Sequence, residues 1–145
     1  MYKAIMPTVF GALTIAVVIA TAPVALAETI TLKASLKASE EVPPNASTAT
    51  GTLQATYDTA TKQLSYTVNY SGLSGNATAA HFHGPADPGK NAGIVVPAQG
   101  SVASPIKGAA TLTDAQAADL TTGKWYFNIH TEANKAGEIR GQVTK

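Results

Sequence analysis

Residues 50–70 read TGTLQATYDTATKQLSYTVNY, with two runs in which apolar and polar residues alternate. Apolar side chains occupy every second position, first from Gly51 to Tyr57 and then from Leu64 to Tyr70. A period of two places the apolar residues on one face of a β-strand, whereas a helix needs a spacing of three to four. Only a short polar segment separates the two runs, so the stretch predicts a β-hairpin with one buried face.

The same alternation continues on both sides of this hairpin. Residues 30–36 repeat it, and the two prolines at positions 43 and 44 end it. Five further short strands are expected, at about 78–83, 93–96, 106–112, 124–131 and 138–143. A capping-box pattern, Thr113 with Gln116 three residues later, predicts one short helix over about 113–121 with Gly123 as its stop. Seven to eight strands with one helix predict an all-β fold, either an antiparallel Greek-key β-sandwich or a flattened barrel.

The composition limits what the chain can do. Its 145 residues suit one domain, and its ten basic and nine acidic residues give a net charge of +1 with no basic cluster. A nucleic-acid-binding surface is therefore not expected. The absence of cysteine excludes disulfides, thiolate metal sites and cysteine nucleophiles.

The first 27 residues follow the pattern of a secretory signal. Lys3 precedes an uncharged apolar run over 7–22, and Ala25-Leu26-Ala27 places small residues at both positions that a signal peptidase reads. We expect cleavage after this tripeptide, which leaves residues 28–145 as one periplasmic or secreted domain with no membrane contact. A membrane anchor is the alternative, because the uncharged stretch is long enough to span a bilayer.

The chain has three histidines, and strand parity places them together. His81 and His83 flank Phe82, and His130 lies three residues beyond Phe127. Because both phenylalanines belong to the core face, all three imidazoles are expected on the outer face of the sheet. If the two strands are neighbours, the imidazoles converge, since neighbouring strands lie about 5 Å apart.

Three converging imidazoles predict a metal site with His81, His83 and His130 as ligands. Imidazole binds copper, zinc, nickel and iron, and Cu²⁺ binds nitrogen and oxygen donors more tightly than the other divalent first-row ions. Copper is therefore the expected ion and zinc the second choice. The alternative is that the histidines are polar outward residues of a half-exposed sheet that holds no metal.

Four residues near the histidines are further candidates. Asp87 and Glu132 follow the two histidine strands, either as carboxylates that ligate or orient a ligand or as ordinary loop acids. Tyr126 and Asn128 share the face of His130, where they either donate to a metal-bound water or are simply exposed strand residues.

Several segments, in this order along the chain, resemble the CHRD domain, a module named after chordin that is widespread in exported bacterial proteins. They are Ala80-His81-Phe82-His83-Gly84-Pro85-Ala86, Ile94-Val95-Val96, Leu112-Thr113-Asp114-Ala115-Gln116, Tyr126-Phe127-Asn128-Ile129-His130-Thr131 and Gly137-Glu138-Ile139-Arg140-Gly141-Gln142. The resemblance extends over residues 30–143. It implies an immunoglobulin-like or superoxide-dismutase-like β-sandwich and leaves the activity open.

A looser resemblance links the histidines to the copper site of copper/zinc superoxide dismutase, where a His-x-His strand and a distant third histidine sit outside a β-barrel. This chain lacks the further histidines for a bridging ligand and a zinc site, and it has no disulfide. We expect Glu138 and Arg140 to pair on an exposed strand face, and nothing in the sequence makes Arg140 an anion guide.

Two classes of function remain from the sequence. The first is an exported copper-binding protein for storage, delivery or redox chemistry. The second is a non-enzymatic module that uses a sheet face or an edge strand to contact another exported protein. The residues favour a non-enzymatic role, because no serine lies in a nucleophile-elbow motif and a dismutase is the least favoured alternative.

Overall fold

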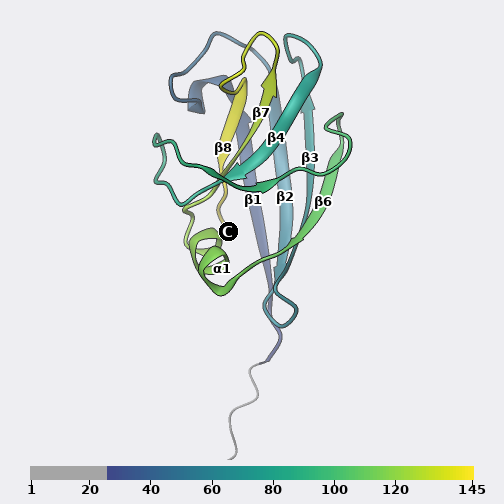
Figure 1. The fold of residues 1–145 in the computed structure, drawn as a ribbon, viewed down its shortest axis with the longest axis vertical. Helices are drawn as coiled ribbons and strands as arrows, with labels where there is room; N and C mark the ends of the chain where they lie inside the picture. Colours follow the sequence, from purple (N-terminus) through teal and green to yellow (C-terminus); the bar gives the residue numbers. More distant parts are fainter. Residues whose placement is uncertain (1–25) are drawn as a thin grey trace, which may run out of the picture.

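The computed structural model describes residues 26–145, which fold into a single antiparallel sheet with one α-helix (Figure 1). Its elements are β1 (Thr29–Lys37), the 3-10 helix η1 (Ala38–Glu40), β2 (Thr50–Asp58), β3 (Gln63–Ser71), β4 (Ala77–His83), β5 (Ile94–Pro97), β6 (Ile106–Thr111), α1 (Asp114–Thr121), β7 (Tyr126–Thr131) and β8 (Ile139–Gln142). The strands pair in the order β5-β4-β7-β8-β1-β2-β3-β6. The sheet curls into a nearly closed barrel, which confirms the predicted all-β antiparallel fold.

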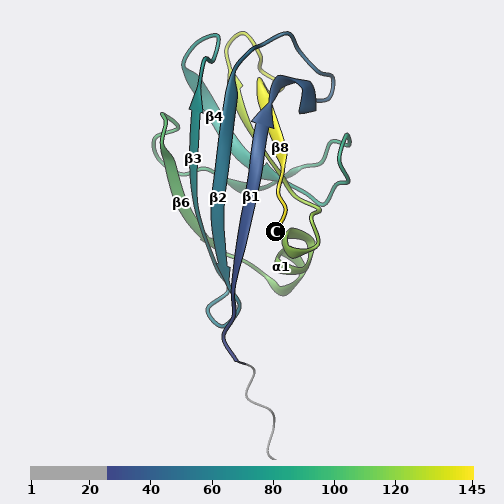
Figure 2. The ribbon, with the colours of Figure 1, turned by 180° about the vertical axis from the view of Figure 1, so that it is seen from behind.

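The predicted hairpin is present as β2 and β3, paired without a bulge from Thr50↔Ser71 to Asp58↔Gln63. β1 pairs with β2 along its whole length, and β6 pairs with the other edge of β3. Figure 2 shows these four strands side by side from behind. The second half of the sheet joins them through the pair Lys37↔Arg140 between β1 and β8 and a bridge from Lys33 to Thr144.

The core fills the space between the two halves. Eight inward side chains from both halves are all 5% exposed or less: Leu53, Leu64, Tyr66, Val68, Phe82, Trp125, Phe127 and Ile129. Tyr66 of β3 meets Phe82 of β4 edge-on across this core, with ring centroids 5.0 Å apart. Such aromatic pairs contribute stability beyond the burial of their apolar surface. The inward side chains of both halves therefore stabilise one shared core.

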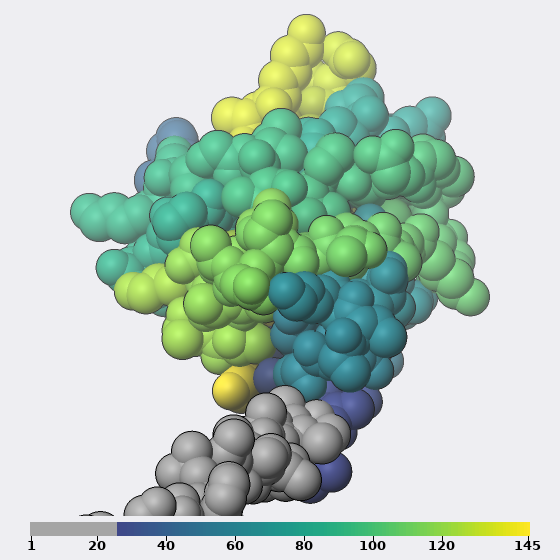
Figure 3. Space-filling view, turned by 60° about the horizontal axis from the view of Figure 1, so that its bottom comes forward, coloured from purple at the N-terminus to yellow at the C-terminus, as the bar shows by residue number. Residues whose placement is uncertain are grey.

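The helix begins and ends as its sequence predicts. Thr113 accepts a hydrogen bond from the Gln116 backbone and donates its own backbone N–H to the Gln116 side chain, which completes the capping box. Gly123 follows the helix with a φ of 77°, a conformation that favours glycine. Figure 3 looks at the end of the barrel where α1 lies, and there the β2–β3 turn lies beside the segment that leads into α1. Lys62 of this turn pairs with Asp114 at the start of α1, at a distance of 2.6 Å.

The predicted signal segment, residues 1–27, falls almost entirely outside the described residues, and its cleavage stays a prediction. Within residues 26–145, no helix combines the length and the apolar character needed to cross a bilayer.

Candidate metal centre

The histidines come together because β4 and β7 are neighbours. Their antiparallel register pairs His81 with Asn128, His83 with Tyr126 and Ala79 with His130. One ligand atom from each histidine then lies within 4.8 Å of the other two. The structure therefore brings together the three residues that strand parity had placed on one face.

The histidines lie on the outer face of the sheet, as predicted, but much of this face is covered and not exposed. Four of its side chains are buried, with exposed fractions of 8% for His83, 3% for Tyr126, 3% for Asn128 and 1% for Arg140. The loop over 84–93 covers the face, because the Arg140 guanidinium donates to Asn91 Oδ1 at 2.9 Å and to Lys90 O at 2.6 Å. Asn91 in turn donates to Val42 O at 3.0 Å, so a second segment closes the same face. His81 and His130 stay half-buried at its border.

Backbone carbonyls set the tautomers of two rings. His83 Nδ1 lies 3.0 Å from Ala92 O, and His130 Nδ1 lies 2.9 Å from Lys135 O. A carbonyl oxygen only accepts, so each Nδ1 carries the hydrogen. In a neutral imidazole the other nitrogen then holds a lone pair, which leaves both Nε2 atoms as acceptors.

These lone pairs point to one place. His83 Nε2 and His130 Nε2 each lie 3.0 Å from Asn128 Oδ1. His81 Nδ1 lies 3.2 Å from His130 Nε2. Two acceptor nitrogens and an amide oxygen thus crowd together with a third imidazole, an arrangement that a shared proton or a cation stabilises.

The surroundings of His81 and His83 disfavour the protonated form of both rings. Burial, together with the neighbouring His130 and His83, lowers the pKa of His81 to about 4. Burial also lowers the pKa of His83, although contacts with Ala92 and Asn128 oppose this effect. Both rings are neutral at pH 7, which is the form that binds metal ions.

A stack of side chains holds His83 from behind. The Tyr126 ring lies parallel to the His83 ring, with an interplanar angle of 2° and centroids 4.8 Å apart. Arg140 covers the other face of Tyr126, with its Cζ 3.4 Å from the ring centroid. This cation–π contact and the loop contacts of Arg140 fix the orientation of His83 before any ligand arrives.

The predicted pair of Glu138 and Arg140 on an exposed strand face is wrong, because both side chains are buried and they point to different partners. Glu138 accepts hydrogen bonds from Ser47 Oγ at 2.7 Å, Ser74 Oγ at 2.6 Å and Thr131 Oγ1 at 2.6 Å. Burial alone would raise the pKa of Glu138, but these hydrogen bonds outweigh it and lower the pKa to about 2. Glu138 therefore ties two loops to the end of β7, next to His130, and offers no free ligand atom.

Sequence reasoning missed Glu41, a carboxyl group behind the cluster. Its side chain is 5% exposed, and its Oε1 has no hydrogen-bond partner among the described residues. Burial raises the pKa of Glu41 to about 7, although the Arg140 charge and the Asn128 amide lower it. Glu41 lies in the irregular segment between β1 and β2, where no periodicity indicates the direction of a side chain.

The two loop acids considered from sequence take no part in the cluster. Asp87 pairs with Lys124, and Glu132 pairs with Lys135 at 3.4 Å. The side chains of Asp87, Glu132 and Lys135 are largely exposed to solvent, and that of Lys124 is partly exposed. The carboxylates of Asp87 and Glu132 are ordinary surface acids, as the simpler of the two sequence hypotheses had it.

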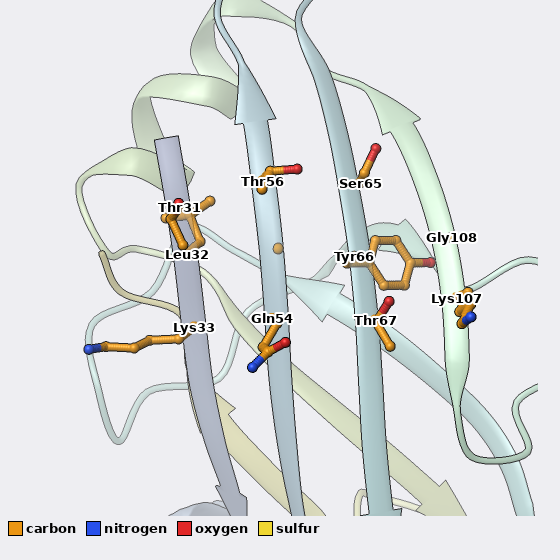
Figure 4. A pocket seen from close by; sticks show the side chains of 11 residues that line it. Thr31, Leu32, Lys33, Gln54, Thr56, Ser65, Tyr66, Thr67, Lys107 and Gly108 are labelled. Carbon is orange, nitrogen blue, oxygen red and sulfur yellow. The ribbon is translucent and has the colours of Figure 1, made fainter. Parts of the chain in front are cut away.

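A hollow of about 680 Å³ lies elsewhere, on the outer face of β1, β2, β3 and β6 (Figure 4). Its side walls are two rows of outward side chains, Thr31, Thr56 and Ser65 on one side and Lys33, Gln54, Thr67 and Lys107 on the other. This lining contains hydroxyls, one amide and two lysines, but no carboxylate or imidazole. The set of residues able to bind a metal ion therefore lies in the histidine cluster and not in this hollow.

The family model of the CHRD domain matches residues 32–143. No curated protein and no solved structure is matched. Because the match extends over most of the chain, the chain belongs to the CHRD domain family. This confirms the resemblance seen in the sequence, and it adds nothing to the likeness with superoxide dismutase.

Proposed function

We propose that this member of the CHRD family is a metal-binding protein that holds one divalent copper ion at His81, His83 and His130. The observation that supports the proposal most is the pair of Nδ1–H groups held by Ala92 O and Lys135 O. They direct the Nε2 atoms of His83 and His130 toward the cluster, where the lone pair of a neutral ring can bind a metal ion. Backbone carbonyls that fix the tautomer in this way are typical of histidine metal sites.

The geometry requires little movement to accept an ion. Two nitrogens bound at about 2.1 Å can lie no more than about 4.2 Å apart. The three candidate ligand atoms lie within 4.8 Å of one another, so the widest separation must close by several tenths of an ångström. His81 and His130 are half-buried, which leaves their rings room to turn toward the ion.

Copper is favoured over zinc by the general order of affinities for nitrogen donors. The divalent form is favoured over Cu⁺ because soft sulfur ligands select Cu⁺. The chain has no cysteine, and its only methionines are Met1 and Met6. Zinc is the second candidate, since three histidines and one open position also suit Zn²⁺.

We propose that the protein works in the periplasm or after secretion, where it stores or delivers copper or takes part in its redox chemistry. The signal-like pattern of residues 1–27 supports this location. The proposal includes no dismutase activity, because Arg140 is buried and contacts the loop over 84–93. An arginine in that position cannot guide an anion from solvent.

The test is a titration of metal-free protein with Cu²⁺, followed by calorimetry and electron paramagnetic resonance (EPR). We expect one ion per chain and a spectrum with nitrogen couplings from imidazole. His83→Ala and His130→Ala should each remove most of the binding, and Lys33→Gln on the opposite half of the sheet should leave it unchanged. Equal binding by the triple histidine variant, or no binding by the unaltered protein, would refute the proposal and leave the interaction module as the better hypothesis.

A further inference from the structure

We infer that Asn128 Oδ1 is the fourth ligand atom of this centre and that Glu41 positions the Asn128 amide. The resulting set of three nitrogens and one oxygen selects a divalent ion over Cu⁺. The inference rests on the proposed metal site and concerns two residues that the histidine pattern does not include. Asn128 is the residue paired with His81 across β4 and β7, so the sheet itself holds it beside the imidazoles.

The distances around Asn128 match those between ligands of one ion. Two donors bound at about 2.0–2.1 Å lie about 2.9 Å apart at a right angle and about 3.4 Å apart at the tetrahedral angle. Asn128 Oδ1 lies 3.0 Å from His83 Nε2 and 3.0 Å from His130 Nε2, and His130 Nε2 lies 3.2 Å from His81 Nδ1. All three separations fall within this interval.

The hydrogen-bond chemistry of the ligand-free cluster leads to the same assignment. Asn128 Oδ1 can only accept, and the two Nε2 atoms beside it are also acceptors when the rings are neutral. The amide oxygen contacts both acceptor nitrogens, and each of these acceptor–acceptor contacts is repulsive unless a positive group lies between the atoms. A bound cation converts each of these contacts into a ligand–ligand separation, and the burial of Asn128 keeps water from competing for its oxygen.

Glu41 determines which end of the amide faces the histidines. A Cβ atom on Gly137 would collide with Glu41 Oε1 and would lie 2.8 Å from Asn128 Nδ2, so the carboxyl and the amide nitrogen share the space beside this glycine. Gly137 has a φ of 133°, which permits this close approach. Asn128 Nδ2 thus lies on the Glu41 side of the amide, where the amide lowers the Glu41 pKa, and Oδ1 lies on the side of the imidazoles. In the proposed centre, Glu41 acts as a positioning residue that does not touch the ion.

An amide oxygen affects which ion is bound. Oxygen donors suit hard cations, whereas Cu⁺ prefers thiolate and thioether sulfur. A buried oxygen held against the ion therefore favours Cu²⁺ or Zn²⁺, and removal of that oxygen should reduce the preference.

The experiment compares matched variants in the same protein, with Cu²⁺ and with Cu⁺ held under reducing conditions as the probes. Asn128→Leu removes the oxygen and keeps the branching of the side chain, and we expect Cu²⁺ affinity to fall more than tenfold while Cu⁺ affinity changes less. Glu41→Gln should weaken Cu²⁺ binding about 10- to 100-fold, the range seen when partners behind metal ligands are lost. The controls are Asn69→Leu on the outer face of β3 and Glu40→Gln next to Glu41 in the chain; both residues are exposed, and both variants should bind as the unaltered protein does.

A spectroscopic readout separates ligation from a purely structural role. Asn128→Asp keeps an oxygen in place and adds a charge, so Cu²⁺ should stay bound with a changed EPR spectrum. If Asn128→Leu does not fold, the Asn128→Asp variant still tests whether residue 128 binds the ion. An unchanged EPR spectrum in that variant would mean that residue 128 is not a ligand. Identical affinity and spectra in the Leu and Asp variants would overturn the inference while the histidine variants still tested the metal site. Absence of Cu²⁺ binding by the unaltered protein would refute both.

Discussion

The outward side chains of β1, β2 and β3 meet solvent, whereas most of those of β7 and β8, and His83 of β4, lie under a second layer of chain. Every second residue of β2 is exposed up to Thr56, but five of the six residues of β7 are buried. Both regions belong to one sheet and cover one core. The open face carries threonines and lysines, and the covered face carries His83, Asn128 and Arg140.

The difference comes from the connections between the strands. The β2–β3 turn takes four residues and leaves the open face free, while ten residues link β4 to β5 and fold across the covered face. A longer connection can bring backbone carbonyls such as Ala92 O over the strands, where they hold side chains in place. Periodicity therefore determines which residues share a face, and the connections determine whether that face is a surface or a site.

The largest effect is expected at Phe127, which belongs to the core that both regions share. Phe127→Ala should lower the free energy of unfolding by about 3–5 kcal/mol, because it removes a buried ring and leaves a cavity. Chemical denaturation followed by tryptophan fluorescence measures this change, since Trp125 lies in the same core. A loss below about 1 kcal/mol would mean that the two halves do not depend on one core.

The second prediction is that the covered face binds a copper ion and that the open face does not. Copper that binds only the folded protein should stabilise it by about 2.7 kcal/mol at a free concentration 100 times Kd. We expect the midpoint of thermal unfolding to rise by several degrees, and His83→Ala to remove most of this rise. Scanning calorimetry with and without Cu²⁺ provides the measurement.

Lys107→Gln on the open face is the matched control for the copper effect and should keep the full increase in melting temperature. An equal rise in the His83 variant would place the ion elsewhere and would erase the proposed distinction between the two faces.

Much of this architecture follows from the sequence, and the reasons for the exceptions are specific. The alternation at Leu53, Leu64 and Val68 predicts the hairpin. The alternation around Phe82 and Phe127 predicts that the three histidines lie on one face, where they converge if the two strands are neighbours. Neither pattern predicts the cover, because the loop over 84–93 has no periodicity and its contacts with Arg140 join residues about 50 positions apart. Glu41 was missed for the same reason.

The third prediction compares a buried and an exposed carboxylate. Glu138→Gln should cost about 1–3 kcal/mol at pH 7, because three hydroxyl groups lose an ionised acceptor. The folded pKa of Glu138 is about 2, below its usual 4.5, so its contribution is complete above about pH 4.5 and is lost as the pH falls through 2. Unfolding curves of both proteins should therefore approach each other in acid.

On the open face, Asp58 also has a lowered pKa, mainly because of its hydrogen bond with Thr61. Asp58 holds only the adjacent turn, so Asp58→Asn should change stability less than Glu138→Gln does. A pH-independent cost of Glu138→Gln would show that its charge does not contribute.

The smallest effect is expected at Thr52, in the middle of the open face. Its neighbours across β1 and β3 are Ser35 and Asn69, and all three side chains are exposed. Thr52→Val keeps the shape and the β-branched side chain, so the free energy of unfolding should change by no more than about 0.5 kcal/mol. Denaturant unfolding at two protein concentrations, with light scattering for the molar mass, tests this expectation. A cost above about 1 kcal/mol that depends on protein concentration would show that a second copy covers this region in solution. Both regions of the outer surface would then be covered, one by the protein's own loops and the other by a partner.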